Sequence, residues 1–341
     1  MPTLPITRTG LVVPVRIDPR GRTGPTPGQA RGPRWRSPGP RFFTPADVPL
    51  TSDQRIVEAV ACLPAGAAAT GWAALHWLGA RWFTGVAADG SPLPVPVAIG
   101  DRRCARARPG VTLSEDWLFP NDVVRVDGLP ITVPLRSVTF AARTAPDDIA
   151  AVRVIDMAAY DDLVDLASLR AYADRLVGRQ GRRRLERSLA VADENAWSPM
   201  EVVMRRTWAT HRATRLLCNA PVFDLAGHHL FTPDLFDPAL GLAGEYDGAD
   251  HADGARRRRD LMREELTRRA GVEIVTMMAG RGETDRFRYR LDGAIARAAR
   301  RTGPRAWTLT QPAWWVDTST VARRRALTAS ERETWLRHRR T

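Results

Sequence analysis

The residues whose types and spacing could do chemistry lie in the run T-P-D-L-F-D-P-A-L-G-L-A-G-E-Y-D-G-A-D-H, residues 232–251. Asp234 and Glu245 flank a turn that contains proline and glycine, so we expect each on its own strand of a hairpin. Side chains alternate between the two faces of a strand, which puts Glu245 and Asp247 on the same face. Converging carboxylates repel one another unless a proton or a cation lies among them, and Mg2+ (or Mn2+) takes such oxygen ligands. The spacing predicts a metal-dependent phosphodiester site or its remnant, with a solvated acidic turn as the alternative.

The elements that must position these residues follow from the patterns on either side. Ser198 as N-cap and Pro199 at the first helical position predict a helix that carries Glu201 in its first turn. An acid there also meets the helix dipole favourably, which is the alternative to a role in the site. The order of elements predicts a mixed α/β (α+β) fold. We expect strands at 221–225, 229–236 and 241–247, a basic helix at about 255–270, a strand at 271–278 and a last helix at 284–301.

The expected basic helix carries arginines on several faces and follows the carboxylates directly. A solvated face is the usual role of such a run. Its position beside the carboxylates favours contact with phosphate groups through charge-assisted hydrogen bonds. The candidate nucleic-acid-binding residues are Arg256, Arg257, Arg258, Arg259 and Arg263.

Composition favours a nucleic-acid partner. The net charge is +13, and the isoelectric point is about 11.1, as in many proteins that bind nucleic acid. All 51 basic residues are arginine. A GC-rich genome would explain arginine in place of lysine, but not the excess of base over acid. The three cysteines are far apart and form neither a metal-ligand spacing nor a disulfide framework, which predicts a reducing cytoplasm.

Composition also divides the 341 residues into segments. Residues 1–48 are rich in Pro, Gly and Arg, and we expect a mostly disordered arm. Residues 59–80 lack charged side chains, but Pro64 and Gly66 interrupt them, which favours two soluble helices over a membrane span. We expect next an N-terminal α+β region at 49–145, a helical connector at 146–194, the carboxylate-bearing domain at 195–303 and an Arg- and Trp-rich tail at 304–341. The sequence leaves open whether this tail packs against the body.

Two local signals refine the 49–145 region. Thr51 and Gln54 have the spacing of a capping box, which predicts the start of a helix. Asp127-Gly128 lies between apolar runs and predicts a hairpin turn.

Several short motifs occur in order along the C-terminal half of the chain. They are Ser198-Pro199-x-Glu201, Pro233-Asp234, Glu245-Tyr246-Asp247-Gly248, His251, and Asp260-x-x-Arg263-x-x-Leu266 before Gly271-Val272. With them, residues 195–302 resemble the PD-(D/E)XK restriction-endonuclease-like superfamily, and more closely its Vsr-like branch, as found C-terminal to AbiEi-type antitoxin regions in actinobacterial proteins. A weaker match upstream comprises the helix at Gly71-x-Ala-Ala-Leu75-His76 and residues 126–137.

The resemblance implies a role for each matching residue. Asp234 would be the central metal ligand, Glu245 the second, and Glu201 would support the site from the helix. Magnesium would polarise a phosphoryl oxygen and lower the pKa of a bound water. Asp247 stands where the superfamily motif has lysine, and the chain has no lysine. Vsr-like members use histidine instead, so His251 is the candidate for acid–base help, with a helix cap as its alternative role.

Two function hypotheses remain open at this point. The first is a cytoplasmic DNA-binding protein with a Mg-dependent endonuclease-like domain that acts in defence or repair, without a membrane association. The second is an antitoxin-like regulator, with a toxin or antitoxin as partner protein, whose nuclease fold is inactive. The missing lysine favours the second, whereas Asp234, Glu245 and His251 favour the first. A purely protein-binding module is a third possibility, which the positive charge disfavours.

Overall fold

The computed structural model describes residues 4–101, 105–106, 108–248, 267 and 269–339. The chain divides into two compact units: unit 1 comprises Met1–Ala145 and Ser168–Glu186, and unit 2 comprises Pro146–Ala167 and Arg187–Thr341. Both units combine helices with β-sheets, which confirms the predicted mixed α/β fold. Within the described residues, no helix has the length and apolar character needed to cross a membrane.

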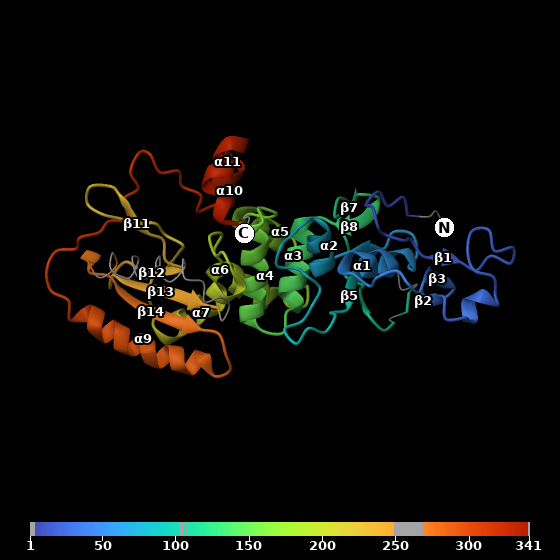
Figure 1. The fold of residues 1–341 in the computed structure, drawn as a ribbon, viewed down its shortest axis with the longest axis horizontal. Helices are drawn as coiled ribbons and strands as arrows, with labels where there is room; N and C mark the ends of the chain where they lie inside the picture. Colours follow the sequence, from blue (N-terminus) through green and yellow to red (C-terminus); the bar gives the residue numbers. More distant parts are fainter. Residues whose placement is uncertain (1–3, 102–104, 107, 249–266, 268, 340–341) are drawn as a thin grey trace. The chain divides into compact units, whose positions relative to one another are not determined.

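Unit 1 is built on a mixed five-stranded sheet of order β6-β5-β4-β8-β7 (Figure 1). Asp127 and Gly128 both have positive φ, 49° and 80°, which confirms the predicted tight hairpin turn between β7 and β8. The strands are β4 (Ala68–Ala69), β5 (Val95–Ala98), β6 (Val111–Ser114), β7 (Val123–Val126) and β8 (Leu129–Thr132). The helices packed with them are α1 (Ser52–Ala61), α2 (Gly71–Trp77) and α3 (Pro134–Thr144).

The expectation of a disordered arm is corrected over residues 4–48. Leu11 and Val13 pack against the apolar core of unit 1. Between them, Val12 makes two backbone hydrogen bonds with the buried Gln54 side chain, of 2.9 and 2.8 Å. The Thr51 hydroxyl accepts a hydrogen bond from the Gln54 backbone N–H, which is one half of the predicted capping box. The Gln54 side chain binds Val12 and does not form the other half. The composition matched a disordered segment because proline and glycine form the turns of this region. Its elements are β1 (Val15–Arg16), η1 (Gln29–Arg31), β2 (Trp35–Gly39) and β3 (Phe42–Pro45).

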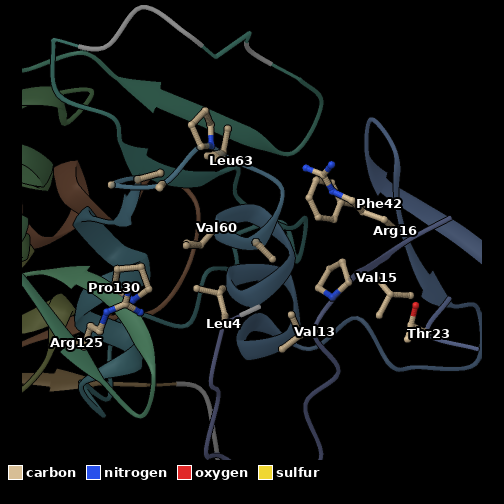
Figure 2. Close-up of a pocket in the computed structure, with 16 residues that line it drawn as sticks. Leu4, Val13, Val15, Arg16, Thr23, Phe42, Val60, Leu63, Arg125 and Pro130 are labelled. Carbon is tan, nitrogen blue, oxygen red and sulfur yellow. The ribbon is translucent and has the colours of Figure 1, made fainter. Parts of the chain in front are cut away.

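A cavity of about 290 Å³ lies where this small sheet meets the end of α1 (Figure 2). Its walls are mainly apolar, with Val15 and Phe42 from the small sheet and Val60 from α1. The Arg16 guanidinium lies 5.1 Å from the centre of the Phe42 ring. Among the residues that the structure describes, those lining the cavity include no acid, histidine or cysteine, so they offer no group for acid–base or metal chemistry.

Unit 2 contains the candidate site, on a four-stranded sheet of order β14-β13-β12-β9 (Figure 1). The hairpin partners β12 and β13 are antiparallel, whereas β13 and β14 are parallel. The strands are β9 (Leu217–Cys218), β12 (Leu235–Asp237), β13 (Leu242–Asp247) and β14 (Glu273–Met278). A separate two-stranded ribbon comprises β10 (Val222–Phe223) and β11 (His229–Phe231). The helices α7 (Pro199–His211) and α9 (Glu283–Ala299) accompany the sheet.

The two faces of this sheet have separate cores, as strand alternation requires. On one face, Leu235 packs with Trp208 from α7 and Phe287 from α9. On the other face, Phe236 packs with Trp307 at a ring-centre distance of 5.0 Å. Burial on both sides fixes the register of β12, because a shift by one residue would exchange the two faces.

Two predicted elements are divided in the structure. The strand expected at 229–236 is interrupted at Thr232-Pro233-Asp234, and its halves β11 and β12 pair in different sheets. Proline has no N–H for a ladder, which accounts for the interruption. The helical region expected at 146–194 comprises α4 (Asp148–Tyr160), α5 (Leu166–Asp174) and α6 (Arg182–Val191), and the division into units runs through α5 and α6.

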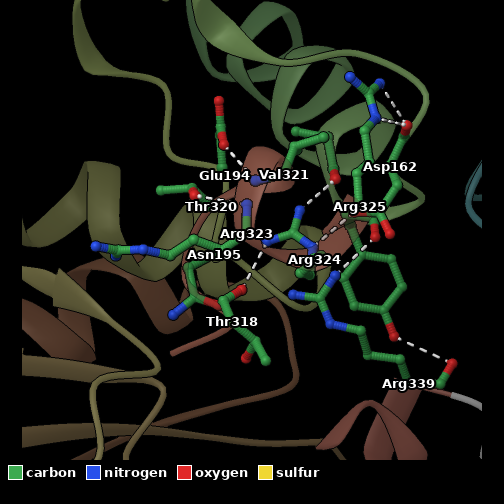
Figure 3. A network of polar contacts seen from close by, with 12 residues as sticks. Asp162, Glu194, Asn195, Thr318, Thr320, Val321, Arg323, Arg324, Arg325 and Arg339 are labelled. Atoms are coloured by element: carbon green, nitrogen blue, oxygen red, sulfur yellow. Dashed lines mark hydrogen bonds and ion pairs between the residues drawn. The ribbon is translucent and has the colours of Figure 1, made fainter. Parts of the chain in front are cut away.

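The C-terminal segment packs against the rest of unit 2 instead of remaining a free tail. The fully buried guanidinium of Arg324 donates to the Asp162 carboxylate and to the backbone oxygens of Ala159 and Thr318, at 2.6, 2.7 and 2.9 Å (Figure 3). Breaking a buried pair of this kind by removing one partner costs about 3–5 kcal/mol. Arg324 thereby attaches α10 (Val321–Arg325) to the end of α4, and α11 (Ala329–Trp335) and η2 (Arg337–Arg339) follow.

Gly244 offers a direct test of the packing between α7 and β13. A Cβ at this position would lie 2.8 Å from Trp208 Cζ3, closer than van der Waals contact allows. We expect Gly244→Ala to lower the free energy of unfolding by about 1–3 kcal/mol, as overpacked cores do. Gly248→Ala is the matched control, because among the described residues its Cβ would meet only Tyr246, at 3.6 Å. Urea unfolding of the full chain measures both, and equal stability of the two variants would contradict the packing described.

Candidate functional site

The candidate site lies at one end of the four-stranded sheet, where β12 begins and β13 ends. This end of the sheet is called the carboxylate edge. The pairing of Leu235 with Gly244 places the preceding Asp234 opposite Glu245 on the neighbouring strand. Asp234 Oδ2 accepts a hydrogen bond from the backbone N–H of Tyr246 at 2.7 Å. The hairpin predicted from the sequence therefore brings Asp234 and Glu245 to the same edge. Both side chains are partly exposed there.

Glu201 reaches the same edge from the first turn of α7. Ser198 caps this helix as predicted, since its hydroxyl accepts from the Glu201 backbone N–H at 3.2 Å. The Glu201 Oε2 atom accepts from the backbone N–H of Trp197 at 2.7 Å and from Asn219 Nδ2 at 2.8 Å. Asn219 in turn donates its backbone N–H to the Asp234 carbonyl at 3.0 Å. These bonds join the start of α7 to the ends of two strands.

The two acids Glu201 and Asp234 interact electrostatically. Burial of the Glu201 carboxyl, and next the charge of Asp234, raise the pKa of Glu201 to about 8. Hydrogen bonds from Trp197, Asn219 and Ser198 oppose this rise. Two carboxylates that share a site behave in this way unless a cation compensates their charge. At neutral pH the pair therefore holds a proton or favours a cation.

Of the remaining predicted site residues, the structure describes Asp247. Asp247 is exposed at the end of β13, where it pairs with Met278 of β14. The resemblance to the PD-(D/E)XK superfamily predicts a lysine at this strand position, where the chain has Asp247. The other candidates, namely His251, Arg256, Arg257, Arg258, Arg259 and Arg263, lie outside the described residues.

The fit of a metal ion rests on the chemistry of these side chains. Across the part of the chain that the structure describes, no three or more His, Cys, Asp or Glu side chains are grouped to hold a metal. Magnesium is usually held by only one or two carboxylates, with waters and substrate phosphates completing its shell. Asp234 and Glu245 offer carboxylate oxygens alone, which suits Mg2+ and not the nitrogen and sulfur ligands typical of zinc.

No family model, curated protein or solved structure matches this chain. The resemblance to the PD-(D/E)XK superfamily therefore stays a prediction from its motifs. The function must be argued from the arrangement of Glu201, Asp234 and Glu245 alone.

The sequence did not point to Asn219, although it lies at the centre of this arrangement. It is 3% exposed and has a left-handed backbone with φ of 45°. Asparagine tolerates this conformation better than most residues. An isolated Asn after a short apolar run carries no recognisable signal, because such residues are common in turns.

A second feature that the sequence did not indicate is a buried charge cluster one turn further along α7. The Arg205 guanidinium donates to the fully buried Asp156 carboxylate of α4. Asp193 lies 3.7 Å away as a second acidic partner. Burial raises the pKa of Asp156 to about 7, against the attraction of Arg205. This cluster holds α7, and with it Glu201, against α4.

The raised pKa of Glu201 predicts a pH-dependent stability. The folded-state pKa of about 8 lies above the ordinary value of 4.5, so the folded protein binds a proton that the unfolded chain releases. Stability from this group is complete below about pH 4.5 and is lost as the pH rises to about 8. We expect a loss on the order of a few kcal/mol across this window, measured by urea unfolding at a series of pH values.

Two variants separate Glu201 from other titrating groups. Glu201→Gln keeps an oxygen acceptor for Trp197 and Asn219 but does not ionise, so stability should fall less over the same window. Asp234→Asn removes the neighbouring charge, so the fall should move to lower pH. Identical profiles for wild type and Glu201→Gln would rule out Glu201 as the cause.

Proposed function

We propose that unit 2 binds DNA at the edge formed by Asp234, Glu245 and Glu201 and hydrolyses a phosphodiester bond with Mg2+. The observation that supports this proposal is the pairing that sets Asp234 opposite Glu245, together with the electrostatic interaction between Asp234 and Glu201. Burial first, and the charge of Asp234 next, raise the pKa of Glu201 to about 8. A cation bound at these carboxylates would reduce the repulsion between Asp234 and Glu201.

The topology supports the same function. The order of a helix, an antiparallel hairpin and a parallel strand places the start of β12 and the ends of β13 and β14 at one edge. The resemblance to the PD-(D/E)XK superfamily implies a core sheet that carries a metal site with a helical glutamate beside it, and this arrangement is compatible with that. The exposed Arg281 lies three residues after the end of β14. With the net charge of +13, such arginines favour a phosphate backbone as the partner.

Each acid has a distinct role in the proposed reaction. Asp234 and Glu245 would hold Mg2+, which when bound polarises a phosphoryl oxygen and lowers the pKa of water. The Tyr246 N–H fixes the orientation of Asp234. Glu201 would hold a proton while the site is empty of cations and release it when a cation lowers its pKa. We place this activity in the cytoplasm.

The proposal predicts that Asp234→Asn abolishes cleavage of supercoiled or mismatched DNA in the presence of Mg2+ or Mn2+. The loss should be about 100-fold or more, since the electrostatic stabilisation by a metal amounts to several kcal/mol. Asp292→Asn is the control, because this acid on α9 is exposed and pairs with His211. Binding of Mn2+ by calorimetry gives a second measurement that is independent of activity.

Two results would overturn the nuclease proposal. One is the absence of metal-dependent cleavage by wild type on supercoiled, mismatched and single-stranded DNA. The other is equal Mn2+ binding by wild type, Asp234→Asn and Glu245→Gln. Full retention of cleavage by Asp292→Asn is expected and guards against a general effect of removing surface charge.

A second candidate function has its own support in the exposed Asp247. Its carboxylate stands in the lysine position, and a chain without lysine cannot supply that base elsewhere. We infer from this an antitoxin-like transcriptional regulator, with a toxin or antitoxin as partner, in which the nuclease fold only binds DNA. Residues 49–145, which resemble part of an AbiEi-type region, would belong to the same regulator.

The regulator hypothesis predicts sequence-specific binding to the DNA upstream of the protein's own coding region. Specific affinity should exceed that for random DNA by about 10³-fold or more at the same salt concentration. Asp234→Asn should leave this ratio unchanged, because no metal chemistry is involved. A gel shift at fixed ionic strength measures the ratio, and equal affinity for both DNAs would exclude a specific regulator.

A further inference from the structure

Unit 2 contains a cavity of about 250 Å³ to which the proposed function assigns no role. It lies between the residues that precede α7, the segment after β9, and the C-terminal segment that Arg324 attaches to α4. Figure 3 shows two of its residues, Asn195 and Thr318, beside this attachment. Its lining combines three indole rings with three side-chain amides, namely Trp197, Trp315, Trp335, Asn195, Asn219 and Gln311.

Asn219 gives this cavity a defined polar character. Its Nδ2 donates to Asn195 O and to Glu201 Oε2, at 2.7 and 2.8 Å. A flipped amide would place an oxygen against a carbonyl and a carboxylate, so these bonds fix its orientation. The remaining atom, Oδ1, is buried and has no hydrogen-bond partner among the described residues. Asn219 lines the cavity, and buried polar atoms are usually paired, so its unpaired acceptor favours a ligand that donates.

The tryptophans provide a preformed aromatic wall. The Trp315 ring lies 4.9 Å from the His229 ring at an interplanar angle of 30° and 5.1 Å from Phe223. It also meets Trp335 edge-on at 5.1 Å. Contacts on several sides hold Trp315 in place before any ligand arrives. Such rings bind planar heterocycles by stacking.

The charge around the cavity argues against a cationic ligand. Asp317 is the one acid among the described residues that line the cavity, and it already receives a hydrogen bond from the Arg323 guanidinium. Its second oxygen accepts from the backbone N–H of Ser319 at 2.8 Å. The acid is therefore neutralised, and the cavity favours a neutral planar group over an ammonium ion.

We propose that this cavity binds a single amino-bearing nucleobase, whose amino group donates to Asn219 Oδ1 while its ring contacts the tryptophans. The proposal rests on the proposed function for the source of the base, a DNA strand at the neighbouring carboxylate edge. The cavity is slightly smaller than the usual range of about 300–1,000 Å³ for drug-sized ligands, which suits one heterocycle. Asn219 connects the two regions, because it also binds Glu201. A base removed from its stack would thus be held next to the carboxylates.

Saturation-transfer NMR with free deoxynucleosides tests the cavity without a DNA backbone. Wild type should bind deoxyadenosine, and N6,N6-dimethyldeoxyadenosine, which lacks the amino donor, should bind at least about fivefold more weakly. Trp335→Ala should weaken binding of deoxyadenosine about tenfold, as expected for the loss of a stacking partner. The control is Trp314→Ala, since Trp314 belongs to the same segment but is 55% exposed and does not line the cavity. Gln311→Ala gives a second cavity variant at an exposed position.

A parallel arm uses single-stranded oligonucleotides and abasic strands of the same length. Trp335→Ala should reduce affinity for the normal strand to that for the abasic strand, whereas Trp314→Ala should not. Oligonucleotide binding without any deoxyadenosine signal in wild type would overturn the nucleobase cavity and leave the DNA proposal standing. Deoxyadenosine binding without DNA binding would contradict the proposed function but support the cavity as a site for free nucleosides. Equal binding of the dimethylated compound would remove the role of Asn219.

Discussion

The carboxylate of Glu201 is the point on which the architecture of unit 2 depends. It accepts from the backbone N–H before α7 and from the side chain that follows β9, so a helix start and a strand end are held by one group. Few side chains can do this, because the acceptor must satisfy two donors in a buried place. The consequence is a buried acid next to Asp234, and the raised pKa follows from its position.

Helix α7 carries an acid, a buried ion pair and an apolar core contact at successive places along its length. Its first turn carries Glu201, its second turn carries Arg205 bound to Asp156, and Trp208 fills the core under Gly244. A helix fixed by buried charge and by tight packing cannot easily move when a cation or a substrate arrives. If the proposed function holds, the carboxylates are therefore preorganised, as electrostatic stabilisation of a developing charge requires. The two neighbouring acids lower the stability of the fold at this edge, whereas the contacts of α7 fix their geometry.

The sequence predicted local features well and long-range contacts poorly. The Ser198 cap, the turn at Asp127-Gly128 and the strand before the last helix follow from short-range rules and were confirmed. The prediction of a disordered arm at 1–48 was wrong over its described residues, because composition does not reveal that Gln54 binds Val12 across 42 positions. The role of Asn219 was not predicted for the same reason, since its partners Asn195 and Asp234 are distant in the sequence. Contacts between segments that are distant in the sequence depend on tertiary packing, which short-range patterns do not determine.

The exposed position of Asp247 bears on what an active site here would have to do. A lysine on this strand would offset the charge of the neighbouring acids, whereas Asp247 adds to it. If the proposed nuclease function holds, a phosphate backbone would approach this edge more readily after a cation has bound. The electrostatic argument then favours binding of the metal before DNA. The net charge of +13, carried by arginine, would attract DNA at a distance, whereas at the carboxylate edge a bound cation would have to offset the acids first.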